Sequence, residues 1–194
     1  MAPAGADSYS DGTVDTAAAH PDHQEPDMTL DLRFALVSFG LAATVAAPVA
    51  QAQAVRSERN VSLELASQIA AATVSACQAG GHAVTAAVVD RAGGLRALHR
   101  ADNAGAHTVE AARAKAWTSA SAKNATLAMM ETAQKNPSAA NLVHIPGFLL
   151  LGGGVPIKVG NEVIGAVGVG GAPGGHLDEQ CALAALDKVK ELLK

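Results

Sequence analysis

The sequence is short of aromatic residues, which limits the ligands that it can hold by stacking. Its 194 residues include one Trp, one Tyr and three Phe. Stacking platforms for single-stranded nucleic acid cannot be extensive in such a chain. The formal net charge of −4 also lacks the basic excess that nucleic-acid-binding domains show. We therefore expect no nucleic-acid partner.

The signature motifs of several enzyme and metal-binding classes are missing too. The two cysteines, Cys77 and Cys181, form no CxxC pair and no zinc-type spacing. No GxSxG nucleophile motif occurs, and the glycine-rich segment 168–175 lacks the Lys-Ser/Thr of a P-loop. Each cysteine lies within an apolar helical pattern, which favours a free buried thiol. A disulfide between them is the alternative.

The N-terminal quarter of the chain does not have the composition of a folded domain. Residues 1–27 are rich in Ala, Asp, Pro and Ser, and such a segment is predicted to be disordered. Residues 28–54 place Arg33 before an apolar run and end in two small-x-small cleavage patterns, as a secretory signal peptide does. Because a signal peptide is read at the N-terminus, we expect translation to begin at Met28, with residues 1–27 an over-extended start.

Removal of this leader changes the charge and the predicted location of the protein. Seven of the 18 acidic residues and one of the 14 basic residues lie before Val55, so 13 basic and 11 acidic residues remain. The apolar run is too short for a comfortable membrane span, so we expect none after processing. The sequence predicts a periplasmic or secreted protein with one domain, residues 55–194.

The spacing of apolar residues in this domain predicts alternating helices and strands. Ser62 is a suitable N-cap for the first helix. The helices are expected at residues 63–77, 107–124, 125–135 and 177–193, and the strands at 83–90, 95–100, 148–151, 156–159 and 163–169. The predicted fold class is α/β (α+β), a single five-stranded, largely antiparallel sheet flanked by helices.

The central predicted helix has one face of small residues between an imidazole and a hydroxyl. The members of this face, at steps of four, three and four, are His107, Ala111, Ala114 and Thr118, and the charged residues that flank it are Glu110, Arg113 and Lys115. A flat, apolar, acidic cofactor such as haem needs a smooth wall, an axial donor and cations for its propionates. Close helix packing with His107 as a polar cap explains the same spacing.

Other polar residues have simpler explanations. Asp90 ends an apolar strand before a glycine turn, where an Asx-type turn is expected. Asp102 lies in a polar loop before the central helix and suits capping. His82 and His99 lie beside strands and are alternative ligands.

Several short motifs follow one another in order through nearly the whole predicted domain. They are Val88-Val89-Asp90-Arg91-x-Gly, Arg100-x-Asp102-x-Ala104, His107-Thr108-x-Glu110-x-Ala112-x-x-Lys115-Ala116-x-Thr118, Ile145-Pro146-Gly147, Gly152-Gly153-Gly154-Val155-Pro156, Ile164-Gly165-Ala166-Val167-Gly168-Val169 and Asp178-Glu179. Together they resemble the GlcG/HbpS-like family, which includes the C-terminal part of PduO proteins. No single motif is specific, whereas the ensemble is.

The resemblance implies a small α/β domain that assembles into homo-oligomers. It also implies haem as the cofactor in secreted members, with roles in iron sensing, storage or handling. The metal ligand on this interpretation is His107. The remaining cofactor-binding positions are Ala111, Ala114 and Thr118 along the macrocycle, and Arg113 or Lys115 near the propionates.

Two other functions are compatible with the same residues. One is an enzyme for a small carboxylate or aldehyde, with Asp102, His107 and Lys115 as acid–base groups. The other is a non-catalytic assembly module in which the small-residue face is a subunit interface.

Overall fold

The computed structural model describes residues 54–194 of the chain. The predicted disordered extension and nearly all of the predicted signal peptide lie outside these residues. Within the described part, no helix is both long enough and apolar enough to span a membrane.

The four strands of the domain form one antiparallel sheet in the order β2-β1-β4-β3. Their bounds are Thr85–Asp90 (β1), Leu95–Arg100 (β2), Gly154–Val159 (β3) and Glu162–Gly170 (β4). At the β1–β2 turn, Asp90 Oδ1 accepts hydrogen bonds from the backbone N–H groups of Ala92 and Gly94. Asp90 therefore has the turn role that the sequence predicts.

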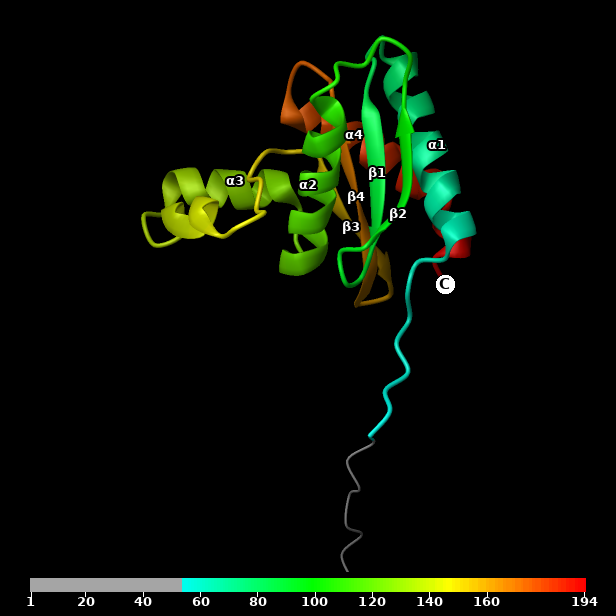
Figure 1. Cartoon of the computed structure of the whole chain (residues 1–194), viewed down its shortest axis with the longest axis horizontal. Coiled ribbons are helices and arrows are strands. Elements are labelled where there is room, and N and C mark those ends of the chain that lie inside the picture. The colour runs from blue at the N-terminus through cyan, green and yellow to red at the C-terminus, as the bar shows by residue number, and fades with distance from the viewer. Residues whose placement is uncertain (1–53) are drawn as a thin grey trace, which may run out of the picture. The chain divides into compact units, whose positions relative to one another are not determined.

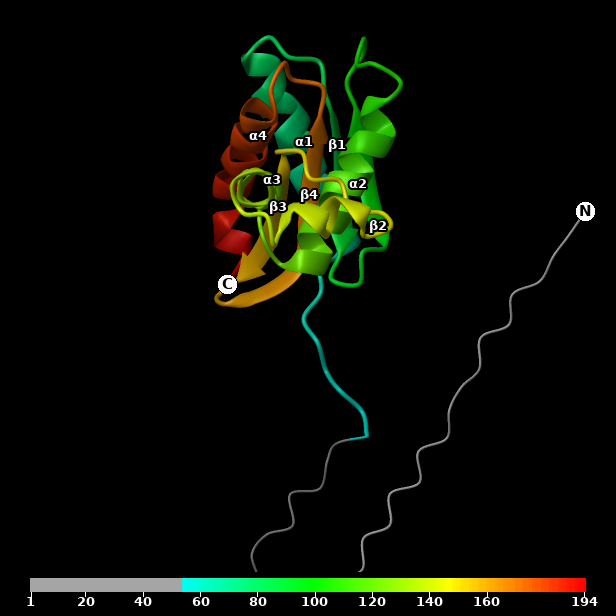
Figure 2. The same cartoon turned by 90° about the vertical axis from the view of Figure 1, so that its left-hand side faces the viewer.

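Helices cover both faces of the sheet (Figures 1 and 2). Helices α1 (Leu63–Ala79) and α4 (Gly175–Lys188) pack side by side on one face, and α2 (Thr108–Ala122) covers the other. The Ser62 hydroxyl caps α1 by accepting a hydrogen bond from the Leu65 N–H. Most of the apolar core lies between the sheet and the α1–α4 pair. Short 3-10 segments lie at Ala140–His144 and Lys190–Leu192.

Helix α3 (Thr126–Lys135) and the Ala140–His144 segment stand away from the sheet as a projecting arm, residues 126–144 (Figure 1). No buried residue lies in the Ala140–His144 segment. The arm is therefore held to the domain mainly through the start of α3.

The backbone of α2 approaches strand β4 closely. A Cβ atom at Gly168 would lie 2.0 Å from the carbonyl oxygen of Ala112, closer than real Cβ contacts occur. The residues that allow this approach are Ala112, Ala116 and Ala120, each at most 3% exposed. The tightly packed alanines are thus a different set from the predicted small-residue face of α2.

The predicted strand at 148–151 is wrong, and the sheet formed by residues 54–194 has four strands instead of five. Side chains, in place of a neighbouring strand, hydrogen-bond the backbone of this segment. The Thr118 hydroxyl accepts from the Leu149 N–H at 2.9 Å, and the Thr126 hydroxyl donates to the Leu151 carbonyl at 2.6 Å. These two backbone groups therefore have hydrogen-bond partners without strand pairing.

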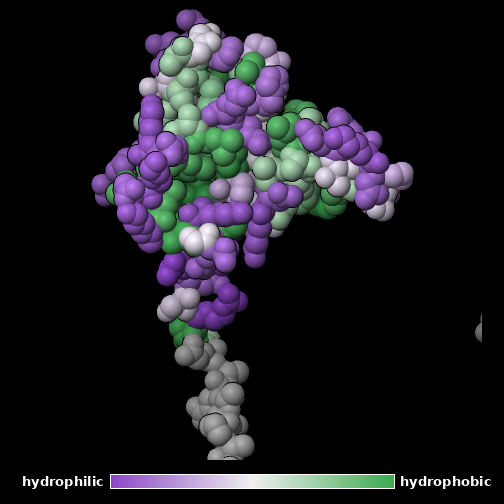
Figure 3. Space-filling model, turned by 180° about the vertical axis from the view of Figure 1, so that it is seen from behind, coloured by the Kyte–Doolittle hydropathy of each residue, from purple (hydrophilic) through white to green (hydrophobic). Residues whose placement is uncertain are grey.

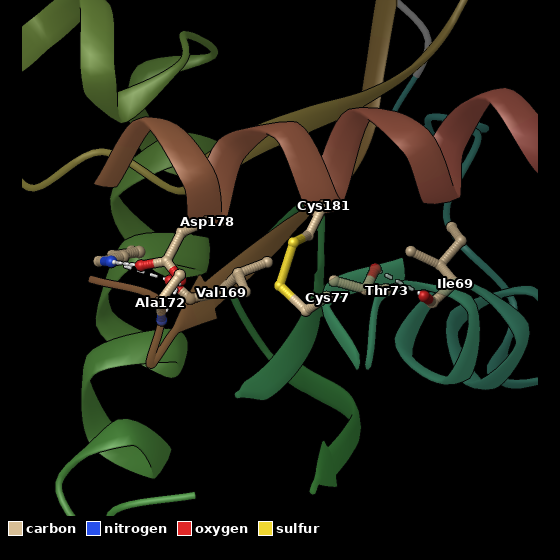
Figure 4. The surroundings of a disulfide bond; sticks show 8 residues. Ile69, Thr73, Cys77, Val169, Ala172, Asp178 and Cys181 are labelled. Carbon is tan, nitrogen blue, oxygen red and sulfur yellow. Dashed lines mark hydrogen bonds and ion pairs between the residues drawn. A yellow bond between two sulfur atoms is a disulfide. The ribbon is translucent and has the colours of Figure 1, made fainter. Parts of the chain in front are cut away.

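A disulfide joins Cys77 of α1 to Cys181 of α4 (Figure 4). The prediction of free buried thiols is therefore wrong. The two helices pack side by side and bring the Cα atoms to 5.3 Å, within the range that a disulfide requires. The cysteines are 104 residues apart in sequence.

Candidate functional site

A cavity of about 340 Å³ lies where α2 and α4 begin, and we call it the α2/α4 pocket. His107 contributes from the start of α2 and His176 from the start of α4. The glycine-rich loop 170–175 joins β4 to α4 along one side. Four apolar side chains also line it, namely Ala111, Leu127, Met130 and Leu151.

Lys115 and Asp178 form a buried ion pair in the wall of this pocket. Lys115 Nζ lies 2.8 Å from Asp178 Oδ2, and the residues are 4% and 2% exposed. Asp178 Oδ1 accepts a hydrogen bond from the Ala172 N–H at 3.0 Å (Figure 4). Burial raises the pKa of Asp178 above its ordinary value, while the neighbouring Lys115 ammonium opposes this rise.

The structure divides the predicted face of α2 between different environments. His107, Ala111 and Lys115 line the α2/α4 pocket, with His107 exposed. Ala114 lines a second hollow beside Trp117. Thr118 is fully buried and donates its hydroxyl hydrogen to the Ala114 carbonyl, so it does not line the α2/α4 pocket.

Each of the two predicted propionate partners has an acidic partner in the structure. Lys115 is paired with Asp178, so its charge is largely compensated. Arg113 is exposed, lines the second hollow and pairs with Glu110 at 3.1 Å. Exposed pairs of this kind contribute little stability, so Arg113 is the more easily redirected of the two cations.

The proposed acid–base group of three residues is not assembled. Asp102 is exposed in the loop before α2 and does not line the pocket that holds His107 and Lys115. His82 lines a separate hollow with Cys181. His99 lies exposed on β2. The alternative ligands therefore lie outside the α2/α4 pocket.

Sequence reasoning missed His176 as a site residue. It lies in the first turn of α4 and shares the pocket with His107, although 69 positions separate them in the chain. The glycine pair at 174–175 indicates the start of a helix close to His176. It does not indicate that the start of α2, with His107, lies on the same pocket.

Glu179, the residue after Asp178 of the ion pair, has a partly buried carboxyl group. Its Oε2 atom is buried with no hydrogen-bond partner in the described residues. Burial raises the pKa of Glu179 above its ordinary value of 4.5, and the nearby Glu131 adds to the rise. The folded state then holds more protons than the unfolded state between the two pKa values, as it also does for Asp178.

We therefore expect the contribution of these groups to the free energy of unfolding to decrease as pH rises from about 4 and to level off above the folded pKa values. Urea unfolding at pH 4, 5, 6 and 7 measures this. The variant Glu179→Gln, which cannot ionise, should flatten the decrease, and Glu64→Gln on the exposed side of α1 should leave it unchanged. Equal slopes for all three proteins would contradict the assignment to Glu179.

Residues 61–187 match the family model described as "Haem degrading protein HbpS-like". The chain belongs to this HbpS-like family. Protein GlcG of Escherichia coli strain K12 is 36% identical to it over 109 residues, which are 56% of this chain and 80% of GlcG. The resemblance inferred from the sequence motifs is thus confirmed.

Solved structures of several proteins share the fold. A double mutant of Streptomyces reticuli HbpS gives a TM-score of 0.65 at 37% identity, over 74% of this chain and 97% of HbpS. Klebsiella pneumoniae protein ORFY gives 0.66 at 30% identity, over 70% and 94%. A PduOC:Heme complex gives 0.56 at 25% identity, over 62% and 88%. The last of these connects the fold with haem.

Proposed function

We propose that this protein is an exported, homo-oligomeric haem-binding protein, with His107 at the rim of the α2/α4 pocket as the axial ligand. The observation that carries the proposal is an exposed imidazole on an apolar-lined pocket in an HbpS-like domain. His imidazole is a usual protein ligand of haem iron. His176, on the same pocket, is the second candidate.

The residues of the α2/α4 pocket fit haem in donor type and in wall character. Ala111, Leu127 and Met130 give an apolar surface for the macrocycle, and His107 has no capping hydrogen bond that would occupy its side chain. When bound, haem would supply an iron atom that the imidazole of His107 would ligate. The part this chain plays is to hold that iron through an imidazole and to shield one face of the ring.

The size of the pocket supports a role for a second copy of the chain. A cavity of about 340 Å³ is at the small end of the range for ligand sites, and a porphyrin would extend beyond it. Exposed apolar side chains at Val143, Ile145 and Leu151 are available near the arm, and Figure 3 shows hydrophobic surface on both the domain and the arm. Such surface favours self-association.

Export is supported by the cysteine chemistry of the described residues. Structural disulfides persist in oxidising compartments and are rare in the cytosol. The Cys77–Cys181 disulfide therefore agrees with the signal peptide predicted for residues 28–54. The proposed location and ligand support a role in haem or iron sensing, storage or handling.

The proposal predicts saturable haem binding by the full chain. Haemin titrated into the protein should produce a shifted Soret band that saturates at a fixed ratio per subunit. On size-exclusion chromatography, haem absorbance should elute with an assembly larger than one chain. The fluorescence of Trp117, the one tryptophan in the sequence, should be quenched in parallel. A linear, unsaturable absorbance change with haem eluting separately would contradict haem binding.

A further inference from the structure

The Lys115 ammonium is a buried charge that does not use all of its hydrogen-bonding capacity. Its Nζ donates to the Val169 carbonyl and to Asp178 Oδ2, both at 2.8 Å. An ammonium group has three N–H donors. Among residues 54–194 these are the two acceptors of its hydrogen bonds, so one N–H of this pocket-lining residue remains for a ligand.

The acidic partner of Lys115 has its own donors. Asp178 Oδ2 accepts from Lys115, and Asp178 Oδ1 accepts from the Ala172 N–H. The Asp178 carboxylate thus compensates the charge of the Lys115 ammonium. The group of this pair that remains for a ligand is an N–H donor of Lys115. A ligand that completes this arrangement must supply an acceptor oxygen.

The other polar groups around the pocket also favour an anionic ligand. Helices α2 and α4 both begin on it, and neither helix has a side-chain hydrogen bond capping its first turn. The N–H groups of Thr108, Leu177 and Asp178 donate to the carbonyls of Gly105 and Gly174. The first turn of α4 therefore offers the N–H groups of Gly175 and His176, together with the positive partial charge of a helix N-terminus. His107 and His176 add two imidazoles at the rim. Among the lining residues Asp178 is the one carboxylate, and it is paired with Lys115.

Two glycines, Gly152 and Gly153, leave space beside the Lys115 ammonium and the start of α4. Gly153 has φ of +117°, and a Cβ atom there would lie 3.2 Å from Lys115 Nζ. A Cβ at Gly152 would lie 2.9 Å from the backbone of Gly175. A larger side chain at either position would crowd the Lys115–Asp178 pair or the start of α4. These glycines leave room near the pair for a small group rather than a bulky one.

We infer that the α2/α4 pocket is a carboxylate-binding site, in which the free N–H of Lys115 and the first turn of α4 hold the carboxylate oxygens. Two sources supply this chemistry, a propionate of haem and a free small monocarboxylate. The first source rests on the proposed haem function, whereas the second does not.

The test uses sodium propionate as the probe and the ¹⁵N-labelled full chain. The backbone amides of Gly171, Gly175 and His176 should shift saturably with propionate and not with sodium chloride at equal ionic strength. The variant Ala111→Leu, which fills the pocket from α2, should weaken propionate binding at least tenfold. Ala122→Leu, the same change at the far end of α2, is the matched control and should leave binding unchanged.

A second measurement needs no variant. Haemin and its dimethyl ester, which has no free carboxylate, are titrated into the wild-type protein, and haemin should bind at least tenfold more tightly. No amide shift with propionate together with equal haemin and ester affinities would overturn the carboxylate site while leaving haem binding intact. Propionate binding without haemin binding would support the site and refute the haem proposal. Shifts that persist in Ala111→Leu would overturn the assignment to this pocket.

Discussion

Replacing Asp178 by alanine is expected to lower the free energy of unfolding by about 3–5 kcal/mol. Lys115 would then carry a positive charge at 4% exposure with only the Val169 carbonyl as a partner. Loss of the Asp178 carboxylate would also leave the Ala172 N–H without its acceptor. Removing one partner of a buried ion pair lowers stability strongly, because the remaining charge is out of contact with water and no longer has an opposite charge beside it. Urea unfolding followed by circular dichroism at pH 7 measures the loss.

The double variant Lys115→Met/Asp178→Leu separates the charge effect from packing. Removal of both charges leaves no unpaired ion, so the double variant should be more stable than Asp178→Ala alone. Asp187→Ala is the matched control, because Asp187 forms an exposed pair with Lys190 and should change stability by less than about 1 kcal/mol. The losses of stability in Lys115→Met and in Asp178→Leu are measured separately and added. If the double variant loses as much stability as this sum, the two charges do not interact.

The second large effect is expected at the disulfide. Replacing both Cys77 and Cys181 by alanine should lower the free energy of unfolding by about 2–5 kcal/mol. The crosslink closes a loop between residues 104 apart, so its loss increases the freedom of the unfolded chain. It also removes the covalent link between α1 and α4, which pack together on one face of the sheet. Thermal and urea unfolding of the variant and wild-type protein measure this difference.

Reduction of the wild-type protein controls for the missing sulfur atoms. Because Cys77 is fully buried and Cys181 is 8% exposed, alanine substitution also leaves a small cavity. Wild-type protein unfolded with and without a reductant shows the crosslink effect alone. Equal stability in the two conditions would mean that the disulfide does not support the fold.

The local parts of the fold could be predicted from sequence, and the parts that depend on tertiary contact could not. Ser62 identifies the start of α1, and the Asp90-containing turn follows from its neighbouring glycines. The 148–151 segment has the composition of a strand, but Thr118 and Thr126 are placed by helix packing to bind its backbone. The sequence of residues 148–151 alone does not indicate that the hydroxyls of Thr118 and Thr126 lie beside it.

The candidate site shows the same division. The position of His107 at a helix start was predictable from local pattern, and its pocket was not. Lys115 looks like a free cation in the sequence because its partner, Asp178, is 63 residues away. Likewise, the helical patterns around Cys77 and Cys181 are those of ordinary core positions, and only the packing of α1 on α4 brings them together.

Haem ligation in the α2/α4 pocket is tested most directly by a haemin titration that compares wild-type protein with His107→Ala, His176→Ala and the double variant. The Soret band of His107→Ala should differ from that of the wild type, with affinity at least tenfold lower. The double variant should lose the ligated spectrum. The control is His99→Ala, an exposed imidazole on β2 outside the α2/α4 pocket, and it should match the wild type. A wild-type spectrum and affinity in the double variant would contradict haem ligation in this pocket.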